Sequence, residues 1–447
     1  MTFAPHPLQI KAAQCWARGD LYGADDALAA LIKDQGGATP QTDLMTLRLS
    51  LDLLEFERAE QALARLKETN GNDPQVAMAG ARLLTWQGQR DEALELLAAA
   101  MRDAPDHPGM VALLITHGRD VSAEILSRAE AIAMHLGDTS PEKTGLLFPL
   151  ARHYDRVGEH ERSWSLITEA NRLSSLRMGA QADPEALKTA AINRAQKAIA
   201  KASQLPHAAP RSQRHVYLIG APRTGSSLLQ SILSADPGVD SSGERGALLP
   251  YLHEITDSQA TPPSDHLSRL QVADLSGLER AGRTAPVLID KTTHNAFVAP
   301  LIAAIHPGST FINVTRRPQD IALSMLFHEF PPAFPESTSL ESITAMLDAR
   351  ATLMRAYEDA DFKVSKFDFD AFTKAPAEHG QTLGDVTGIP FEARFLHPEN
   401  RNAAVPTFSA GQVRQPIKQT PPDKWKRFAE FMPDTVKERL DALASAA

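Results

Sequence analysis

The stretch His215–Leu229, HVYLIGAPRTGSSLL, decides the fold of the second half of this chain. It begins with a short apolar run, Val216–Ile219, which predicts a buried strand. A turn from Gly220 to Ser227 follows, and the apolar run after it predicts a helix. The first N–H groups of a helix have no helical partner, and the helix dipole favours negative charge there. The order of strand, glycine turn and helix therefore predicts an anion-binding site.

The turn has the spacing of a Walker A loop, Gly-x4-Gly-Lys-Ser/Thr, except that Ser226 stands where the lysine belongs. That lysine holds the β- and γ-phosphates of a nucleoside triphosphate, so its replacement argues against ATP or GTP chemistry. Arg223 supplies a cation inside the loop, and a guanidinium suits a planar oxyanion. The residues that we expect to bind the anion are Gly220, Pro222, Arg223, Thr224, Gly225, Ser226 and Ser227.

The composition limits the class of protein. The chain has 447 residues, enough for two or three hydrophobic cores, and its net charge of -9 argues against nucleic acid as a partner. Cys15 is the single cysteine, so an internal disulfide is excluded. No apolar run approaches the roughly 20 residues of a membrane-spanning helix. The N-terminus lacks the basic and then apolar order of a secretory signal, so we expect a cytoplasmic protein.

A pattern recurs in the first 180 residues. Gly19, Leu54, Gly88 and Gly158 each precede a small residue by five positions, and they are separated by 35, 34 and 70 residues. This spacing resembles the period of about 34 residues of tetratricopeptide repeats. We expect the small residue that opens the second helix of each pair to let it pack closely against the first. A helical solenoid of this kind presents a concave surface for a polypeptide or partner. The alternatives are an unrepeated helical bundle, or an array that only braces the second domain.

Three segments follow from these patterns: a helical repeat domain over 1–180, a helix and linker over 181–212, and a domain over 213–447. The predicted fold class is therefore an all-helical solenoid followed by an α/β domain of the P-loop type with a central parallel sheet.

Charged residues follow two further predicted strands. Glu244 comes just after Val239–Ser242 and is a candidate general base for an acceptor hydroxyl. The alternative is a carboxylate that interacts with a helix N-terminus. Lys291 follows Val287–Asp290 and is a candidate cation for a leaving oxygen. The alternatives here are a surface lysine, or Asp290 as a magnesium ligand in a nucleoside triphosphatase.

A third strand, Thr310–Val314, is followed by Arg316 and by a helix that contains Ser324. A bidentate arginine and a hydroxyl suit a terminal phosphate dianion. The alternative is a pair of arginines on a solvated strand end. The tail from Pro406 to Phe428 contains Ser409, Arg414 and Lys418, and one expectation for it is an ordered C-terminal cap packed through Phe408 and Trp425.

Together these segments resemble a known family. The loop Pro-Arg-Thr-Gly-Ser-Ser, the Ser-Gly-Glu segment, Asp-Lys-x3-Asn, Arg-x-Pro-x-Asp-x3-Ser and the Gln-Val-Arg-Gln-Pro-Ile tail occur in this order over about residues 210–430. They resemble the motifs of bacterial tetratricopeptide-repeat sulfotransferases, whose catalytic domain is similar to that of protein-tyrosine sulfotransferases. One departure is Thr293, where proline is common.

The resemblance implies transfer of a sulfuryl group from PAPS (3′-phosphoadenosine 5′-phosphosulfate) to an acceptor hydroxyl, with PAP as product and no metal requirement. The acceptor that it suggests is a tyrosine of a protein or peptide bound by the repeats. The alternatives are a carbohydrate or small-molecule sulfotransferase, and a repeat scaffold with a non-catalytic or ATP-dependent P-loop domain.

The resemblance also implies roles for single residues. Glu244 is the base, and His294 and His328 are second candidates because several cytosolic sulfotransferases use histidine. Arg223, Lys291 and Ser409 stabilise the leaving PAP. Arg316 and Ser324 bind its 3′-phosphate, and Arg414 and Lys418 close over the nucleotide.

Overall fold

The computed structural model describes residues 5–118, 120–178, 183–331, 334–397, 413, 415–419 and 424–446. They form two compact units, which divide between Gly137 and Asp138. In the described part of the chain, no helix combines the length and the apolar composition needed to cross a bilayer.

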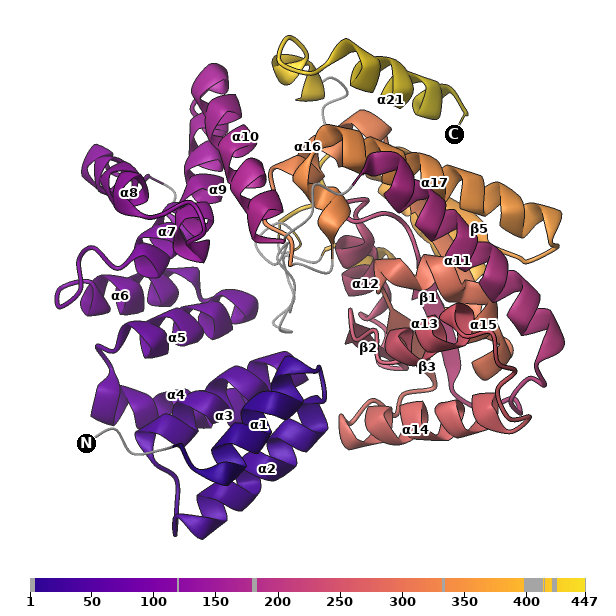
Figure 1. Ribbon diagram of the computed structural model, residues 1–447, viewed down its shortest axis with the longest axis horizontal. Coiled ribbons are helices and arrows are strands. Elements are labelled where there is room, and N and C mark those ends of the chain that lie inside the picture. Colours follow the sequence, from indigo (N-terminus) through magenta and orange to yellow (C-terminus); the bar gives the residue numbers. More distant parts are fainter. Residues whose placement is uncertain are drawn as a thin grey trace. The chain divides into compact units, whose positions relative to one another are not determined.

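The first unit consists of helices that pack as consecutive pairs, α1 with α2, α3 with α4, α5 with α6, and α7 with α8 (Figure 1). Their bounds are α1 Pro7–Ala17, α2 Leu21–Asp34, α3 Pro40–Leu53, α4 Phe56–Asn70, α5 Pro74–Gln87, α6 Arg90–Ala100, α7 Pro108–His117 and α8 Ala123–His135.

The first helix of each pair begins with proline, which suits that position because a first-turn N–H needs no helical acceptor. Pro7, Pro40, Pro74 and Pro108 are separated by 33, 34 and 34 residues, and Pro141, which begins α9 in the second unit, follows after 33. This regular proline interval, which was not among the predicted signals, also covers the stretch near residue 120 where the glycine pattern fails.

The small residues that open the second helices pack closely, as expected, whereas the glycines that precede them have a different role. Gly19 and Gly158 have no atom within 4 Å of where a Cβ would stand, so close packing does not select them. They lie in the turn between paired helices with φ of 79° and 86°, and Leu54 holds the same left-handed turn at φ 63°. The close packing comes five residues later, from the fully buried side chains of Ala24, Ala59, Ala93 and Ser163.

The second unit contains a five-stranded, fully parallel sheet in the order β2-β3-β1-β4-β5. The strands are β1 Arg214–Leu218, β2 Val239–Gly243, β3 Val287–Asp290, β4 Thr310–Thr315 and β5 Ser365–Asp368.

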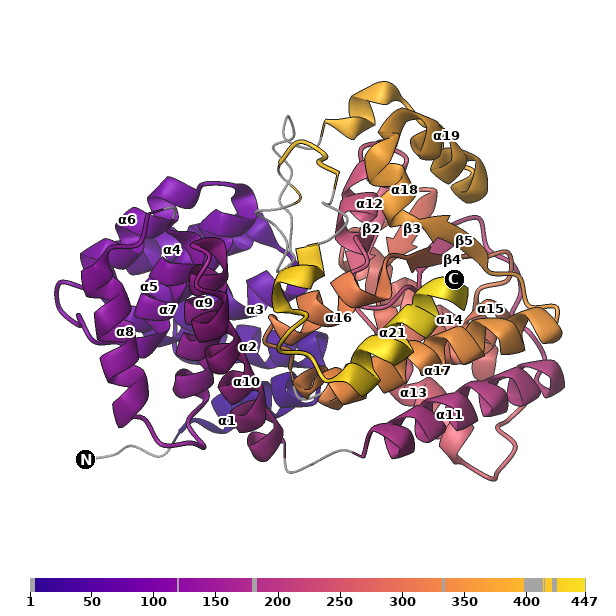
Figure 2. The ribbon, with the colours of Figure 1, turned by 90° about the horizontal axis from the view of Figure 1, so that it is seen from above.

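Helices cover both faces of this sheet (Figure 2). Tyr217 and Ile219 face a core with α11, α13, α14, α15 and α17, while Val216 and Leu218 face a core with α12, α18 and α19. The bounds are α11 Pro184–Gln204, α12 Ser226–Leu233, α13 Leu249–Asp257, α14 His266–Arg280, α15 Ala299–Ile305, α17 Leu340–Asp359, α18 Phe369–Lys374 and α19 Pro376–Thr387.

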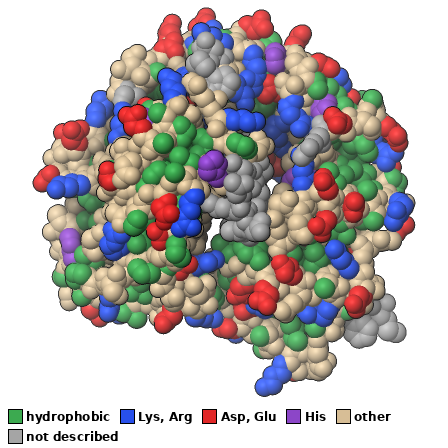
Figure 3. All heavy atoms as spheres, turned by 180° about the vertical axis from the view of Figure 1, so that it is seen from behind, with side chains coloured by type: hydrophobic (Ala, Val, Ile, Leu, Met, Phe, Trp, Pro, Cys, Tyr) green, Lys and Arg blue, Asp and Glu red, His purple; other side chains and the backbone are tan. Residues whose placement is uncertain are grey.

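The helix pair α9 and α10 also belongs to this second unit. The remaining elements are α9 Pro141–Arg156, α10 His160–Arg177, η1 Thr293–Val298, α16 Pro318–Leu326, η2 Pro335–Thr338, η3 Ala393–Leu396, η5 Lys424–Phe428 and α21 Asp434–Ala446. The predicted fold class, a helical N-terminal region followed by an α/β domain with a central parallel sheet, is confirmed. On the face that Figure 3 shows, acidic and basic side chains are interspersed over the described residues.

Candidate functional site

The candidate site lies at the carboxyl end of β1. This strand sits between β3 and β4, and the chain leaves it first toward β2 and β3 and later toward β4. In an open parallel sheet, such a reversal leaves a crevice outside the strand ends, where ligands bind. The predicted anion loop and the segments with Lys291 and Arg316 follow β1, β3 and β4, so the topology gathers them at one edge.

Close neighbours leave no room for a side chain at either glycine of the loop, Gly220 or Gly225. A Cβ on Gly220 would lie 2.3 Å from the carbonyl oxygen of Val314. A Cβ on Gly225 would lie 2.2 Å from the ring of Phe369, and Gly225 is the N-cap of α12 with φ 99°. The loop therefore packs tightly against β4 and α18 and delivers the chain into the first turn of α12.

Arg223 joins the loop to the second predicted motif. Its Nε donates a hydrogen bond of 3.0 Å to the Oγ of Ser324. Arg316 Nη1 donates to the carbonyl oxygen of Arg223 at 3.2 Å. The loop and the Arg316–Ser324 pair, which lie about a hundred residues apart in the sequence, thus meet in one site.

The backbone of Arg223 is left-handed, with φ 69°, which is uncommon for a residue other than glycine. Burial and, to a lesser extent, neighbouring Arg316 lower the pKa of Arg223 to about 10, and Glu244 opposes the shift. A strained backbone thus holds a poorly hydrated guanidinium at the end of β1. Such strain is typical of functional sites.

His328, the residue two positions after α16, lies in the same electrostatic field. Burial, then Arg223 and Arg152, lower the pKa of His328 to about 3. Its imidazole is therefore neutral at pH 7 and is a weak proton acceptor, because a good general base has a pKa near the working pH.

Asp370, at the start of α18, supports both arginines after β4, although no sequence motif indicated it. Its carboxylate lies 3.7 Å from Arg316 Nε and accepts a 2.9 Å hydrogen bond from the backbone N–H of Arg317. Arg317 also pairs with Asp320 at 3.6 Å. Its position could have indicated it, because Asp370 follows the end of β5 just as Arg316 follows the end of β4.

Lys291 and Glu244 form an ion pair across the ends of β3 and β2. The side chain of Lys291 is 2% exposed, whereas that of Glu244 is 56% exposed. The backbone N–H of Lys291 donates to Gly243 O at 2.9 Å, which fixes the two segments against each other. The site therefore presents a buried cation next to an accessible carboxylate.

Asp290 organises the loop that carries Lys291. One carboxylate oxygen accepts from the backbone N–H of Thr292 at 2.8 Å and from Asn295 at 3.0 Å, and the other accepts from Ser242 at 3.1 Å. Burial raises the pKa of Asp290, and the hydrogen bonds from Thr292 oppose this shift. Through these hydrogen bonds, Asp290 fixes the loop that carries Lys291 against β2. Among the described residues, no group of three or more His, Cys, Asp and Glu side chains is placed to hold a metal ion.

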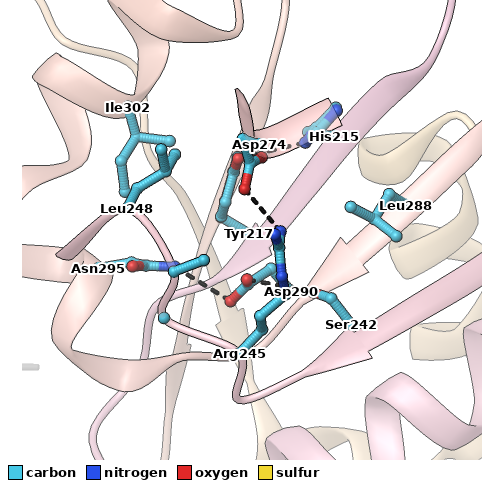
Figure 4. Close-up of a pocket in the computed structure, with 12 residues that line it drawn as sticks. His215, Tyr217, Ser242, Arg245, Leu248, Asp274, Leu288, Asp290, Asn295 and Ile302 are labelled. Atoms are coloured by element: carbon cyan, nitrogen blue, oxygen red, sulfur yellow. Dashed lines mark hydrogen bonds and ion pairs between the residues drawn. The ribbon is translucent and has the colours of Figure 1, made fainter. Parts of the chain in front are cut away.

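A small cavity lies beside Asp290, with polar side chains around it (Figure 4). Arg245 Nη1 donates to Asp274 at 2.5 Å, and Asp274 lies 3.1 Å from Nε2 of His306. The ring of His306 stacks on that of His215, with centroids 4.0 Å apart. This network anchors Arg245 and with it the neighbouring residue Glu244.

Arg350 of α17 is a second support that no sequence motif indicated. It donates to Ile219 O at 3.2 Å and to Thr293 O at 3.1 Å, and its guanidinium lies 4.8 Å from the ring centroid of Phe297. Burial lowers the pKa of Arg350 to about 10. It therefore ties the start of the anion loop to the loop after β3.

The other predicted site residues are placed as follows. His294 lies 3.6 Å from the buried carboxylate of Glu336 and stacks on Phe334. Lys418 is exposed. Ser409 and Arg414 lie outside the described residues, so their roles stay predictions.

Comparisons with known proteins found similarities over about half of the chain. Residues 215–393 match the model of the Sulfotransferase family. An uncharacterised protein of Aquifex aeolicus is 24% identical over 248 residues, which cover 51% of this chain and about a third (32%) of that relative. A putative protein-tyrosine sulfotransferase of Caenorhabditis briggsae is 24% identical over 246 residues, covering 51% of this chain and 85% of the relative. The sulfotransferase domain of the Synechococcus PCC 7002 olefin synthase aligns with 54% of this chain and 95% of its own, at 19% identity and a TM-score of 0.35.

Proposed function

We propose that this chain is a sulfotransferase that moves the sulfuryl group of PAPS to an acceptor hydroxyl. The observation that supports this most is the contact of Arg223 with Ser324, together with the hydrogen bond from Arg316 to the Arg223 carbonyl. These contacts bring two predicted anion-binding motifs to one place, as a donor with a phosphosulfate and a separate 3′-phosphate requires. The family match over residues 215–393 supports the same activity.

The donor fits the described residues. The N–H groups at the start of α12 and the guanidinium of Arg223 would hold the phosphosulfate end. Arg316, braced by Asp370, and the hydroxyl of Ser324 would hold the 3′-phosphate.

In the proposed reaction, Glu244 takes the proton of the acceptor hydroxyl as that oxygen forms its bond to sulfur. The bond between sulfur and the bridging oxygen of the donor breaks, and its electron pair stays on the 5′-phosphate of PAP. Lys291 and Arg223 stabilise that negative charge. Lys291 contacts one oxygen of Glu244, and a carboxylate has a second oxygen for the proton.

The acceptor that we propose is a tyrosine of a protein or peptide, on the similarity to the putative protein-tyrosine sulfotransferase. We further propose that the paired helices are tetratricopeptide-like repeats that bind this polypeptide. The proline interval of 33 or 34 residues supports that assignment, because the tetratricopeptide period is about 34 residues.

Nucleotide binding tests the donor. PAP without magnesium is expected to raise the melting temperature of the full chain, and ATP with magnesium is expected to leave it unchanged. Stabilisation by ATP with magnesium but not by PAP would instead favour an ATP-dependent enzyme.

Transfer of radiolabelled sulfate from PAPS into a cell lysate then tests the reaction and identifies the acceptor. Glu244→Gln is expected to abolish labelling while PAP binding stays. Unchanged labelling with this variant would remove Glu244 as the base.

A further inference from the structure

The helix pair α9–α10 packs on the carboxyl end of α16, and the two elements lie side by side in Figures 1 and 2. Asn171 of α10 donates to Leu326 O at 2.9 Å, and Arg152 of α9 donates through Nη1 to Phe327 O at 3.1 Å. Thr144 of α9 donates to Glu329 at 3.1 Å. The helix pair therefore holds the end of α16 and the residues just beyond it through hydrogen bonds.

Two arginines from distant parts of the chain reach this helix end. Arg223 of the anion loop binds Ser324, and Arg152 binds the carbonyl of Phe327, three residues later. Three residues are about one helical turn, or roughly 5 Å along the axis. His328 reports the same proximity, since both Arg223 and Arg152 lower its pKa.

Arg152 is poorly hydrated. Burial lowers the pKa of Arg152 to about 10, Glu329 opposes the shift, and Arg223 and Arg156 add to it. Bringing two guanidiniums together away from water is unfavourable unless an anion lies near them. Among the described residues, Glu329 supplies part of that charge from a side chain that is 39% exposed.

We infer that Arg152 is part of the oxyanion site at Arg223 and contacts the phosphosulfate end of the donor. This inference rests on the proposed function for the identity of the donor. A guanidinium has five N–H donors in one plane, so an arginine that binds a carbonyl through Nη1 can present its other edge to an oxyanion. Arg152 lies outside residues 215–393, so the sulfotransferase match does not include it.

A purely structural role for Arg152 is the competing explanation, because cations also bind the last carbonyls of a helix. The two roles differ in the ligand-free protein. A structural arginine stabilises the empty protein. A binding arginine near Arg223 adds repulsion that only the ligand relieves.

The test compares Arg152→Gln, Arg152→Lys and the control Arg172→Gln in the full chain. Arg172 lies in the same helix pair and pairs with Glu169 and Asp138 on the surface, so its removal changes the charge equally. Calorimetric titration measures the affinity for PAP and for inorganic pyrophosphate, and thermal unfolding measures the stability without ligand.

We expect Arg152→Gln to weaken the binding of both probes about 10- to 100-fold, which is typical of losing a charge-assisted hydrogen bond. Its melting temperature without ligand should change little, because relief of the repulsion from Arg223 offsets the lost hydrogen bond to Phe327 O. Arg152→Lys should recover part of the affinity, and Arg172→Gln should bind like the wild type. Unchanged affinity with a lower melting temperature in Arg152→Gln would overturn the inference.

Wild-type binding separates the inference from the proposed function. If the wild type binds pyrophosphate in an Arg152-dependent way but does not bind PAP, the proposed donor is wrong and the anion site stands. If it binds neither probe, both are overturned.

Discussion

The two compact units stabilise their interiors by different means. The first unit is held by apolar clusters such as that of Leu47, Leu63 and Leu83, and Asp43 is the buried charged side chain among its described residues. The second unit has apolar cores on both sheet faces but also buries Lys291 and Arg350. The regular repeat of the first unit thus produces apolar packing between helices. The buried charges of the second unit lie where we expect the reaction to take place.

The sharpest test of this difference removes the buried cation of the site. Lys291→Met is expected to lower the rate of sulfuryl transfer about 100- to 1000-fold, because a preorganised charge at a leaving oxygen contributes roughly 3–4 kcal/mol. Single-turnover transfer from labelled PAPS measures the effect. Lys363→Met, which changes an exposed lysine of the same unit, is the control. A loss below threefold for Lys291→Met would show that this buried charge is structural.

The second test concerns a buried charge that supports the site without lining it. Arg350→Met leaves the carbonyls of Ile219 and Thr293 without their donor, and we expect the free energy of unfolding to fall by about 3 kcal/mol. Urea unfolding measures it. Arg355→Met alters an exposed arginine on the same helix and should change stability by less than about 0.5 kcal/mol. Equal effects of the two variants would remove the proposed tie between the loops.

The third test uses pH, which should affect the two units differently. Burial, with a contribution from His306, lowers the pKa of His215 to about 3, whereas the unfolded chain has a value near 6.5. The neutral form of His215 is therefore favoured on folding. The contribution of His215 to the free energy of unfolding is fully present above pH 6.5 and is lost as the pH falls from there toward 3. At pH 5 the loss is about 2 kcal/mol.

His215→Asn should remove this part of the pH dependence, and urea unfolding at pH 7.5 and pH 5 compares it with the wild type. If both proteins lose the same stability between the two pH values, His215 is not the group responsible.

The smallest expected effect tests the backbone explanation of the helix-pair turns. Gly88→Ala places a side chain at φ 86° and should cost about 1 kcal/mol of stability in the first unit. Gly145→Ala, inside α9 with open space at the Cβ position, should instead gain roughly 0.5–1 kcal/mol in the second. Thermal unfolding shows whether each variant loses or gains stability. If both variants change stability in the same direction, the backbone explanation of these turns is contradicted.

The sequence predicted much of this architecture because periodicity and strand-end motifs are local signals. The order of Gly220, Gly225 and the apolar runs around them predicted the strand, turn and helix, and the parallel sheet followed. Lys291, Glu244, Arg223 and Ser324 were predicted in separate motifs, and the structure supplies their pairing.

Two buried arginines that the sequence did not predict as site residues belong to no motif. Arg350 lies inside an ordinary amphipathic helix, and Arg152 occupies a helix that the repeat pattern counts with the scaffold. Their contacts are with backbone carbonyls of segments that come later or earlier in the chain, and only the tertiary fold reveals them. The spacing predicted the close packing of Ala24, Ala59 and Ala93, but it did not reveal that Gly19, Gly88 and Gly158 adopt a positive φ.

The left-handed backbone of Arg223 has a consequence for how such sites persist. Glycine at this position would relax the backbone and remove a desolvated positive charge, so Arg223→Gly is expected to make the empty protein more robust. An engineering campaign that selects for heat resistance alone would therefore discard the side chain on which the proposed chemistry depends. The left-handed backbone and the buried charge of Arg223 are therefore costs to the empty protein that a bound anion would offset.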